Sequence, residues 1–175
     1  MTRLRLLHAI HDFLPRHQAG SEVYTLELTR ELSKRHDVFV VTAEYDPSTA
    51  HGTIRWRSHE GIPVIEIVNN WEFERFEDTY ASARLNRQLA HVLDATRPDV
   101  LHVHNLLNLS FDLPRLARER GIPSVRRSTI TPSCARLAAS ASTPRNRMCA
   151  TSSIPIGAAG ASWILPFTRS SWQGS

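Results

Sequence analysis

Residues 3–42 read RLRLLHAIHDFLPRHQAGSEVYTLELTRELSKRHDVFVVT, and this stretch decides the fold. The run over 3–10 alternates and then becomes apolar, which is typical of a buried strand. Ser21 is placed to cap a helix over about 22–34, and the apolar run over 37–42 predicts a second buried strand. A strand, a helix and a strand in this order indicate two parallel strands joined by a right-handed crossover.

The same alternation continues to residue 125. We expect further strands over 53–56, 64–68, 99–104 and 122–125, a turn over 61–63, and helices over 78–96 and 111–120. The inward positions that we expect on the helices are Tyr24, Leu28 and Leu32 on the first, and Leu85, Leu89, Val92 and Leu93 on the second. Residues 1–125 are therefore predicted to form an α/β domain, a Rossmann-like parallel sheet with flanking helices. Ligands of such sheets bind beyond the carboxyl ends of the strands.

Composition narrows the classes of function. The net charge is +4 and the pI about 9.7, but arginine supplies all of the positive charge except Lys34, and no basic stripe is present. We therefore do not expect a nucleic-acid partner. Two cysteines are too few for a disulfide framework. No apolar stretch has the length of a membrane span, and the chain opens without a signal peptide, so we expect a cytoplasmic protein.

The composition changes near residue 125. Every histidine lies at or before His104 and every acidic residue at or before Glu119, whereas 126–175 contains no Asp, Glu, Lys or His. Such a segment lacks periodic apolar positions, so we expect an irregular tail. A linker is one interpretation, and a slip of the reading frame is the other. Read in a shifted frame, residues 128–135 permit the sequence His-Asp-Tyr-Thr-Leu-Val-Cys-Ala.

Two loops at strand ends carry candidate binding residues. In the first, Gly20 precedes a helix and lets the backbone approach a ligand, while the helix N-terminus offers N–H groups to a phosphate. A plain turn with a serine cap explains the same residues equally well. The first loop contributes His11, Gly20, Ser21 and Glu22 as candidates.

The second loop begins with a histidine pair. On a strand, His102 and His104 project to the same face, a spacing compatible with a metal ion. Without an obvious third ligand nearby, we favour one packed histidine and one at the strand end, and we predict neither a metal site nor a cofactor. His104 and Asn105 are placed to hydrogen-bond a sugar hydroxyl or a phosphate. We assign no role to the other histidines, including His36, His51, His59 and His91, which we expect at the surface or in loops.

Several segments, taken in their order along the chain, resemble the N-terminal domain of the family 4-like glycosyltransferases. They are Leu7 to Pro15, Ala19 to Tyr24, His36 to Thr42, Arg97 to Asn105 and Gly121 to Pro123. The resemblance implies one half of a GT-B enzyme, in which two Rossmann-like domains face each other across a cleft. It implies retaining transfer of a sugar from a nucleotide-sugar donor to a glycan or lipid-linked acceptor, bound mainly by this half. Its glycine loop approaches the donor diphosphate, although Ala19 replaces the first glycine of the usual pair.

The resemblance also implies what the chain lacks. The family continues after Gly-Ile-Pro with a strand that ends in His-Asp, where this sequence has Thr129 and Ile130; the shifted frame restores that pair. We expect the C-terminal GT-B domain to be missing, the chain to be inactive alone, and no catalytic residue within it. Relatives that build surface glycans suggest peripheral contact with the inner face of the membrane. A non-catalytic sugar- or partner-binding module and a pseudogene remnant stay open as alternatives.

Overall fold

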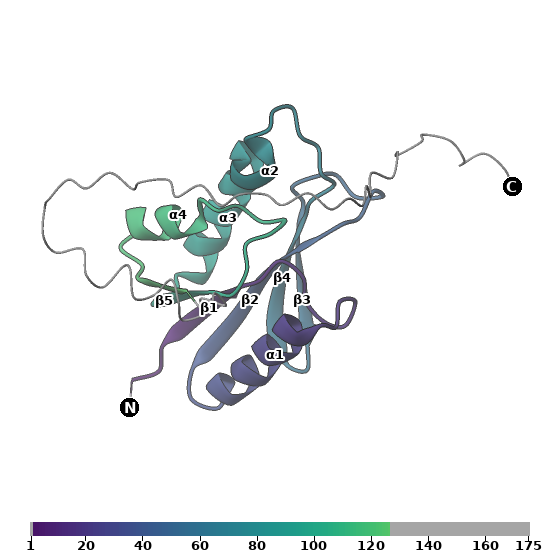
Figure 1. Ribbon diagram of the computed structural model, residues 1–175. Coiled ribbons are helices and arrows are strands. Elements are labelled where there is room, and N and C mark those ends of the chain that lie inside the picture. The colour runs from purple at the N-terminus through teal and green to yellow at the C-terminus, as the bar shows by residue number, and fades with distance from the viewer. Residues whose placement is uncertain (1, 127–175) are drawn as a thin grey trace, which may run out of the picture. The chain divides into compact units, whose positions relative to one another are not determined.

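The structure is a computed structural model that describes residues 2–126 (Figure 1). Its strands are β1 (Arg5–Ala9), β2 (Asp37–Glu44), β3 (Ile54–His59), β4 (Ile62–Val68), β5 (Val100–Val103) and β6 (Ser124–Arg126), and its helices are α1 (Gly20–Ser33), α2 (Asp78–Ala81), α3 (Ala83–Thr96) and α4 (Leu113–Glu119). The strands form one sheet in the order β3-β4-β2-β1-β5-β6. The predicted α/β, Rossmann-like fold is therefore confirmed.

The strand order shows where the chain stops adding strands on one side of β1 and begins adding them on the other. From β1 the chain moves to β2 and β4 on one side, and then returns to β5 and β6 on the other side of β1. Ligands of doubly wound sheets bind at such a reversal, beyond the carboxyl ends of the strands. The loops after β1 and β5 lie at this point.

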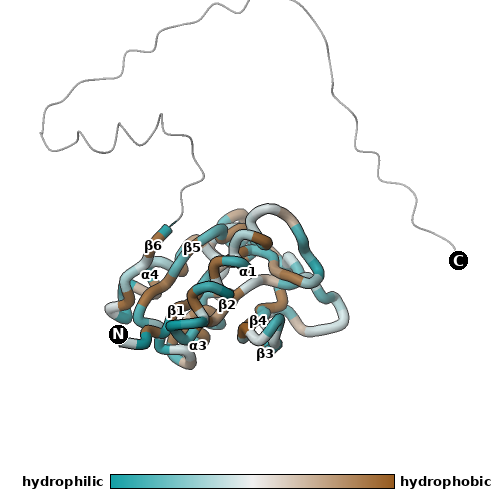
Figure 2. Tube along the Cα trace, turned by 90° about the horizontal axis from the view of Figure 1, so that it is seen from below, coloured by the Kyte–Doolittle hydropathy of each residue, from teal (hydrophilic) through white to brown (hydrophobic). Residues whose placement is uncertain are grey.

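Two apolar layers hold the sheet between helices. Leu7, Ala9, Leu101 and Val103 pack with Leu89 and its neighbours on α3 and α4. On the opposite face, Ile10, Val40 and Val64 pack with Leu26 of α1. Figure 1 shows α1 on one side of the sheet and α3 and α4 on the other, and Figure 2 shows apolar residues recurring along the strands.

One edge of the sheet departs from the predicted all-parallel arrangement. β3 pairs antiparallel with β4, from Ile54 opposite Ile67 to His59 opposite Ile62. The cause is a two-residue turn at Glu60 and Gly61, where φ is 50° and 80°. Two successive positive φ values define the tight hairpin turn that reverses a strand on itself.

The helices differ from the sequence-based prediction in three details. Extended backbone at Ser82, which caps α3 by accepting the N–H of Leu85, divides the helix predicted over 78–96. The helix predicted over 111–120 begins at Leu113 and ends before Gly121, whose φ is 71°. The predicted face of α1 is wrong: Tyr24 is exposed, whereas the helix buries Glu22, Thr25, Leu26 and Thr29.

The described residues end one position beyond the predicted boundary at 125. The expected irregular tail and the shifted reading frame both fall on residues outside the described part of the chain. In residues 2–126, no helix combines the length and the apolar character needed to span a membrane.

Candidate functional site

The carboxyl edge of the sheet gathers the candidate residues. His11 follows β1, Glu22 lies in the first turn of α1, and His104 follows β5 directly. The backbone N–H of His104 donates to the carbonyl of Ala9 at 2.9 Å, which fixes the end of β5 beside the end of β1. The two loops selected from sequence therefore meet at one edge.

Glu22 organises the first turn of α1. Its buried carboxylate accepts hydrogen bonds from the Ala19 N–H at 3.1 Å and from the Ser21 hydroxyl at 3.0 Å, and lies 3.5 Å from Nε2 of His11. An acidic side chain that bonds back to the residue before the helix is one half of a capping box. Ser21 is thus not the N-cap as predicted; Ala19 is, and Ser21 lies inside the first turn.

Gly20 is the first residue of α1, and its place is open. A side-chain carbon added there would have no heavy atom within 4 Å, and the φ of Gly20 lies outside the left-handed region. The fold therefore does not require a glycine at this position. Space beside a helix N-terminus leaves room for a ligand to approach the backbone N–H groups.

His104, at the end of β5, lies next to Tyr24 near the start of α1. The Tyr24 ring meets the His104 ring edge-on, with centroids 6.1 Å apart. Asn105 behaves differently, since its side-chain oxygen accepts the N–H of Leu107 at 3.0 Å. Asn105 therefore shapes its own loop, and this hydrogen bond does not reach another candidate residue.

A third histidine joins the predicted pair. His8 lies on β1 directly opposite His102 on β5, and its Nδ1 lies 2.9 Å from Nε2 of His104. Burial, followed by the nearby His104 and His102, lowers the pKa of His8 to about 3, so this ring is neutral at physiological pH. No third ligand was obvious in the sequence, because His8 lies far from the pair along the chain and is brought beside it by the parallel pairing of β1 and β5.

A cavity of about 330 Å³ opens at the same edge. It is lined by Asp12, His17, Ala43, Glu44, Tyr45, Asn69, Trp71 and Asn108. The rings of Tyr45 and Trp71 stack at 4.7 Å with an angle of 16° between their planes, and both side chains are about half exposed. Asn69 is buried and donates to the Asn108 carbonyl at 2.7 Å.

The backbone at the rim of this cavity is unusual. Trp71 and Asn108, at φ of 55° and 62°, are two of four described non-glycine residues with positive φ. Left-handed backbone at a tryptophan costs on the order of 1–3 kcal/mol, and residues in such conformations cluster at ligand sites. The strained positions therefore support a binding role for the cavity.

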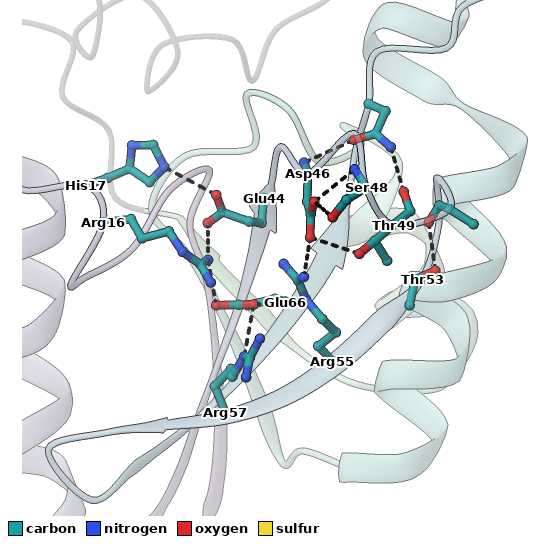
Figure 3. A network of polar contacts seen from close by, with 12 residues as sticks. Arg16, His17, Glu44, Asp46, Ser48, Thr49, Thr53, Arg55, Arg57 and Glu66 are labelled. Atoms are coloured by element: carbon teal, nitrogen blue, oxygen red, sulfur yellow. Dashed lines mark hydrogen bonds and ion pairs between the residues drawn. The ribbon is translucent and has the colours of Figure 1, made fainter.

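A network of ion pairs and hydrogen bonds includes Glu44, one of the residues that line the cavity (Figure 3). Arg16 lies 2.6 Å from the Glu44 carboxylate and 3.0 Å from Glu66, which also pairs with Arg55. Hydrogen bonds from Ser48, Thr49 and Arg55 lower the pKa of Asp46. These contacts connect the loop after β1 with β2, β3 and β4, and so fix the position of Glu44.

Sequence reasoning missed the cavity residues. The candidate residues predicted from sequence lie in the loops after β1 and β5, whereas Tyr45, Asn69 and Trp71 follow β2 and β4. The signal was present, because the same rule about carboxyl strand ends applies to every parallel strand.

Known proteins resemble this chain in sequence and in fold. The sequence model described as Glycosyltransferase Family 4 matches residues 19–127. A structure described as trehalose-6-phosphate from E. coli bound with UDP-2-fluoro glucose is 13% identical, with a TM-score of 0.50, and the match covers 70% of this chain and 32% of that one. For an alpha,alpha-trehalose 6-phosphate synthase from Burkholderia multivorans the identity is 13%, the TM-score 0.45, and the coverage 78% and 36%. The chain thus spans about a third of the length of these two proteins. Comparison with curated proteins gives no match.

Proposed function

Because the chain belongs to glycosyltransferase family 4, we propose that it is the acceptor-side half of a GT-B enzyme that moves a sugar from a nucleotide-sugar donor to an acceptor hydroxyl with retention. One observation carries the proposal. A cavity with aromatic and polar walls shares the carboxyl edge of the sheet with the open first turn of α1. An acceptor in the cavity and a diphosphate at the helix would then meet at one edge.

The cavity suits a sugar in size and chemistry. Its volume of about 330 Å³ is at the lower end of the roughly 300–1,000 Å³ typical of ligand pockets. Aromatic faces pack against the C–H face of a sugar ring, and Tyr45 and Trp71 each keep about half of their surface exposed. Asp12, Glu44 and Asn69 bring oxygen and nitrogen atoms that bond hydroxyl groups. We therefore place the sugar or lipid-linked acceptor there.

The donor is proposed to meet the first turn of α1. The E. coli structure holds a uridine diphosphate sugar, and a donor of that chemical class carries its leaving charge on the diphosphate. Backbone N–H groups at a helix N-terminus stabilise such charge. Gly20 and Ser21 supply these groups, while His11 and Glu22 hold the turn and His104 lies beside it. We assign the remaining donor contacts to a second domain, so the 175-residue chain should not turn over donor by itself.

Saccharide binding tests the acceptor site. We would titrate the chain with a panel of mono- and disaccharides and measure binding by calorimetry and tryptophan fluorescence. Trp71→Ala should weaken binding about tenfold, or ~1.4 kcal/mol. Trp56→Ala is the matched control, because Trp56 is equally exposed but lies on β3, away from the cavity lining.

The outcomes separate the proposal from its alternatives. Equal losses in the two tryptophan variants would contradict the acceptor site. Saccharide binding without any affinity for UDP-glucose would favour a non-catalytic sugar-binding module. Transfer or donor hydrolysis by the chain alone would contradict the assignment of donor contacts to a second domain. The cytoplasmic location and the peripheral membrane contact stay predictions.

A further inference from the structure

We propose that His8, His102 and His104 form a binding site for one Zn²⁺ ion. One ring nitrogen from each histidine lies within 4.8 Å of the corresponding nitrogens of the other two. Three histidine nitrogens with a fourth position left for water are an established zinc arrangement. His104 also lies beside the proposed donor position at the start of α1, but zinc binding can be measured without any donor or acceptor.

The sheet builds this cluster from backbone pairing. His8 and His102 are partners in the parallel register of β1 and β5, so their side chains leave the sheet on the same face. His104 is two residues beyond His102 and projects to that face as well, held by its backbone bond to Ala9. The flanking Leu7, Ala9, Leu101 and Val103 all pack into the layer with α3 and α4. The three rings therefore lie on the α1 face, with Tyr24 against His104.

The distances are close to those that a zinc ion requires. Two nitrogens bound tetrahedrally at about 2.1 Å lie roughly 3.4 Å apart. Nδ1 of His8 and Nε2 of His104 are 2.9 Å apart, and one ring nitrogen of His102 lies within 4.8 Å of a ring nitrogen of each of the other two histidines. Closing the site needs shifts on the order of 1 Å, and His102 and His104 are only partly buried.

The chemistry of the rings also fits. A hydrogen bond between His8 and His104 places one proton between two nitrogens, where a cation would take its place. Nε2 of His8 is buried and has no hydrogen-bond partner among the described residues. A buried polar atom without a partner needs an explanation. Rotation of the His8 ring that brings Nε2 to a bound metal ion would supply the missing partner. Neutral imidazole is the form that binds zinc.

Zinc binding to the untagged 175-residue chain tests the proposal. Both cysteines, Cys134 and Cys149, would be changed to serine so that no thiolate contributes. After treatment with a chelator, the chain would be titrated with Zn²⁺ by calorimetry and with Co²⁺ by visible absorption, which reports the coordination geometry. We expect one ion per chain. His102→Gln and, separately, His104→Gln should each lower the affinity by more than about tenfold.

Two further variants keep the test specific. His91→Gln removes an exposed histidine on α3 and should leave the affinity unchanged. His11→Gln addresses the other group of potential ligands, His11, Asp12 and Glu22, and should also leave it unchanged. Circular dichroism would establish that each variant is folded. If His102→Gln does not fold, the result for His104→Gln decides the test. Binding that survives both His102→Gln and His104→Gln, or that disappears with His11→Gln, would overturn the proposal, as would no binding at all.

Discussion

Gly20 is the residue at which the needs of the fold and of a ligand separate most clearly. An added side-chain carbon would meet no atom within 4 Å, and alanine favours a helix more than glycine does. Gly20→Ala should therefore keep the free energy of unfolding or raise it by up to ~1 kcal/mol. If a diphosphate approaches the α1 backbone, the same change should weaken UDP-glucose binding about tenfold in calorimetry, ~1.4 kcal/mol.

A companion variant tests the opposite direction at the same turn. Ala19 has extended backbone, a conformation that both alanine and glycine adopt. Ala19→Gly should therefore retain or strengthen the affinity for UDP-glucose. An affinity that does not change in Gly20→Ala would count against the phosphate role of this loop.

His51 gives a dependence of stability on pH. It lies in a loop between β2 and β3, as expected, but it is only 5% exposed, and its Nδ1 accepts the N–H of Asn70 at 3.1 Å. Burial lowers the pKa of His51; nearby Glu72 opposes this shift and Arg84 adds to it. The unfolded chain then binds the proton more readily, so stability is fully present above the ordinary pKa of about 6.5 and falls below it. In chemical denaturation between pH 8 and 5, His51→Asn should lose less stability than the parent. Parallel curves would contradict this assignment.

At the scale of elements, apolar runs predicted strands and α3 well because burial on one side leaves a clear pattern. Leu85, Leu89, Val92 and Leu93 are buried as expected. The face of α1 was predicted wrongly because the helix buries the polar residues Thr25 and Thr29, which the spacing of apolar residues does not reveal. The direction of β3 depended on backbone angles at Glu60 and Gly61. Pairing across strands placed His8 beside His102, a contact between residues far apart in the sequence.

Contacts between residues far apart in the sequence also decided how much of the candidate site could be predicted. Local patterns located the loops after β1 and β5, because glycine and a histidine pair at strand ends are visible in the chain. The cavity needed the order of strands in space, since Glu44 and Trp71 reach it from β2 and from the loop after β4. The sequence thus predicted the edge of the sheet at which the candidate residues gather, but not that the loops after β2 and β4 reach the same edge.

At the scale of the whole described domain, two apolar layers share one sheet, so each should depend on the other. Leu89 lies in the layer with α3, whereas Trp56 lies on β3 at the far edge of the sheet. Leu89→Ala removes a fully buried side chain and should lower the free energy of unfolding by about 2–5 kcal/mol. In a chain whose only tryptophan is Trp56, with Trp71, Trp163 and Trp172 replaced by phenylalanine, fluorescence and far-ultraviolet circular dichroism should report one coincident denaturant midpoint. Both signals should move together in Leu89→Ala. A fluorescence midpoint that stays in place while the circular dichroism midpoint falls would mean that the β3–β4 edge unfolds independently of the α3 layer.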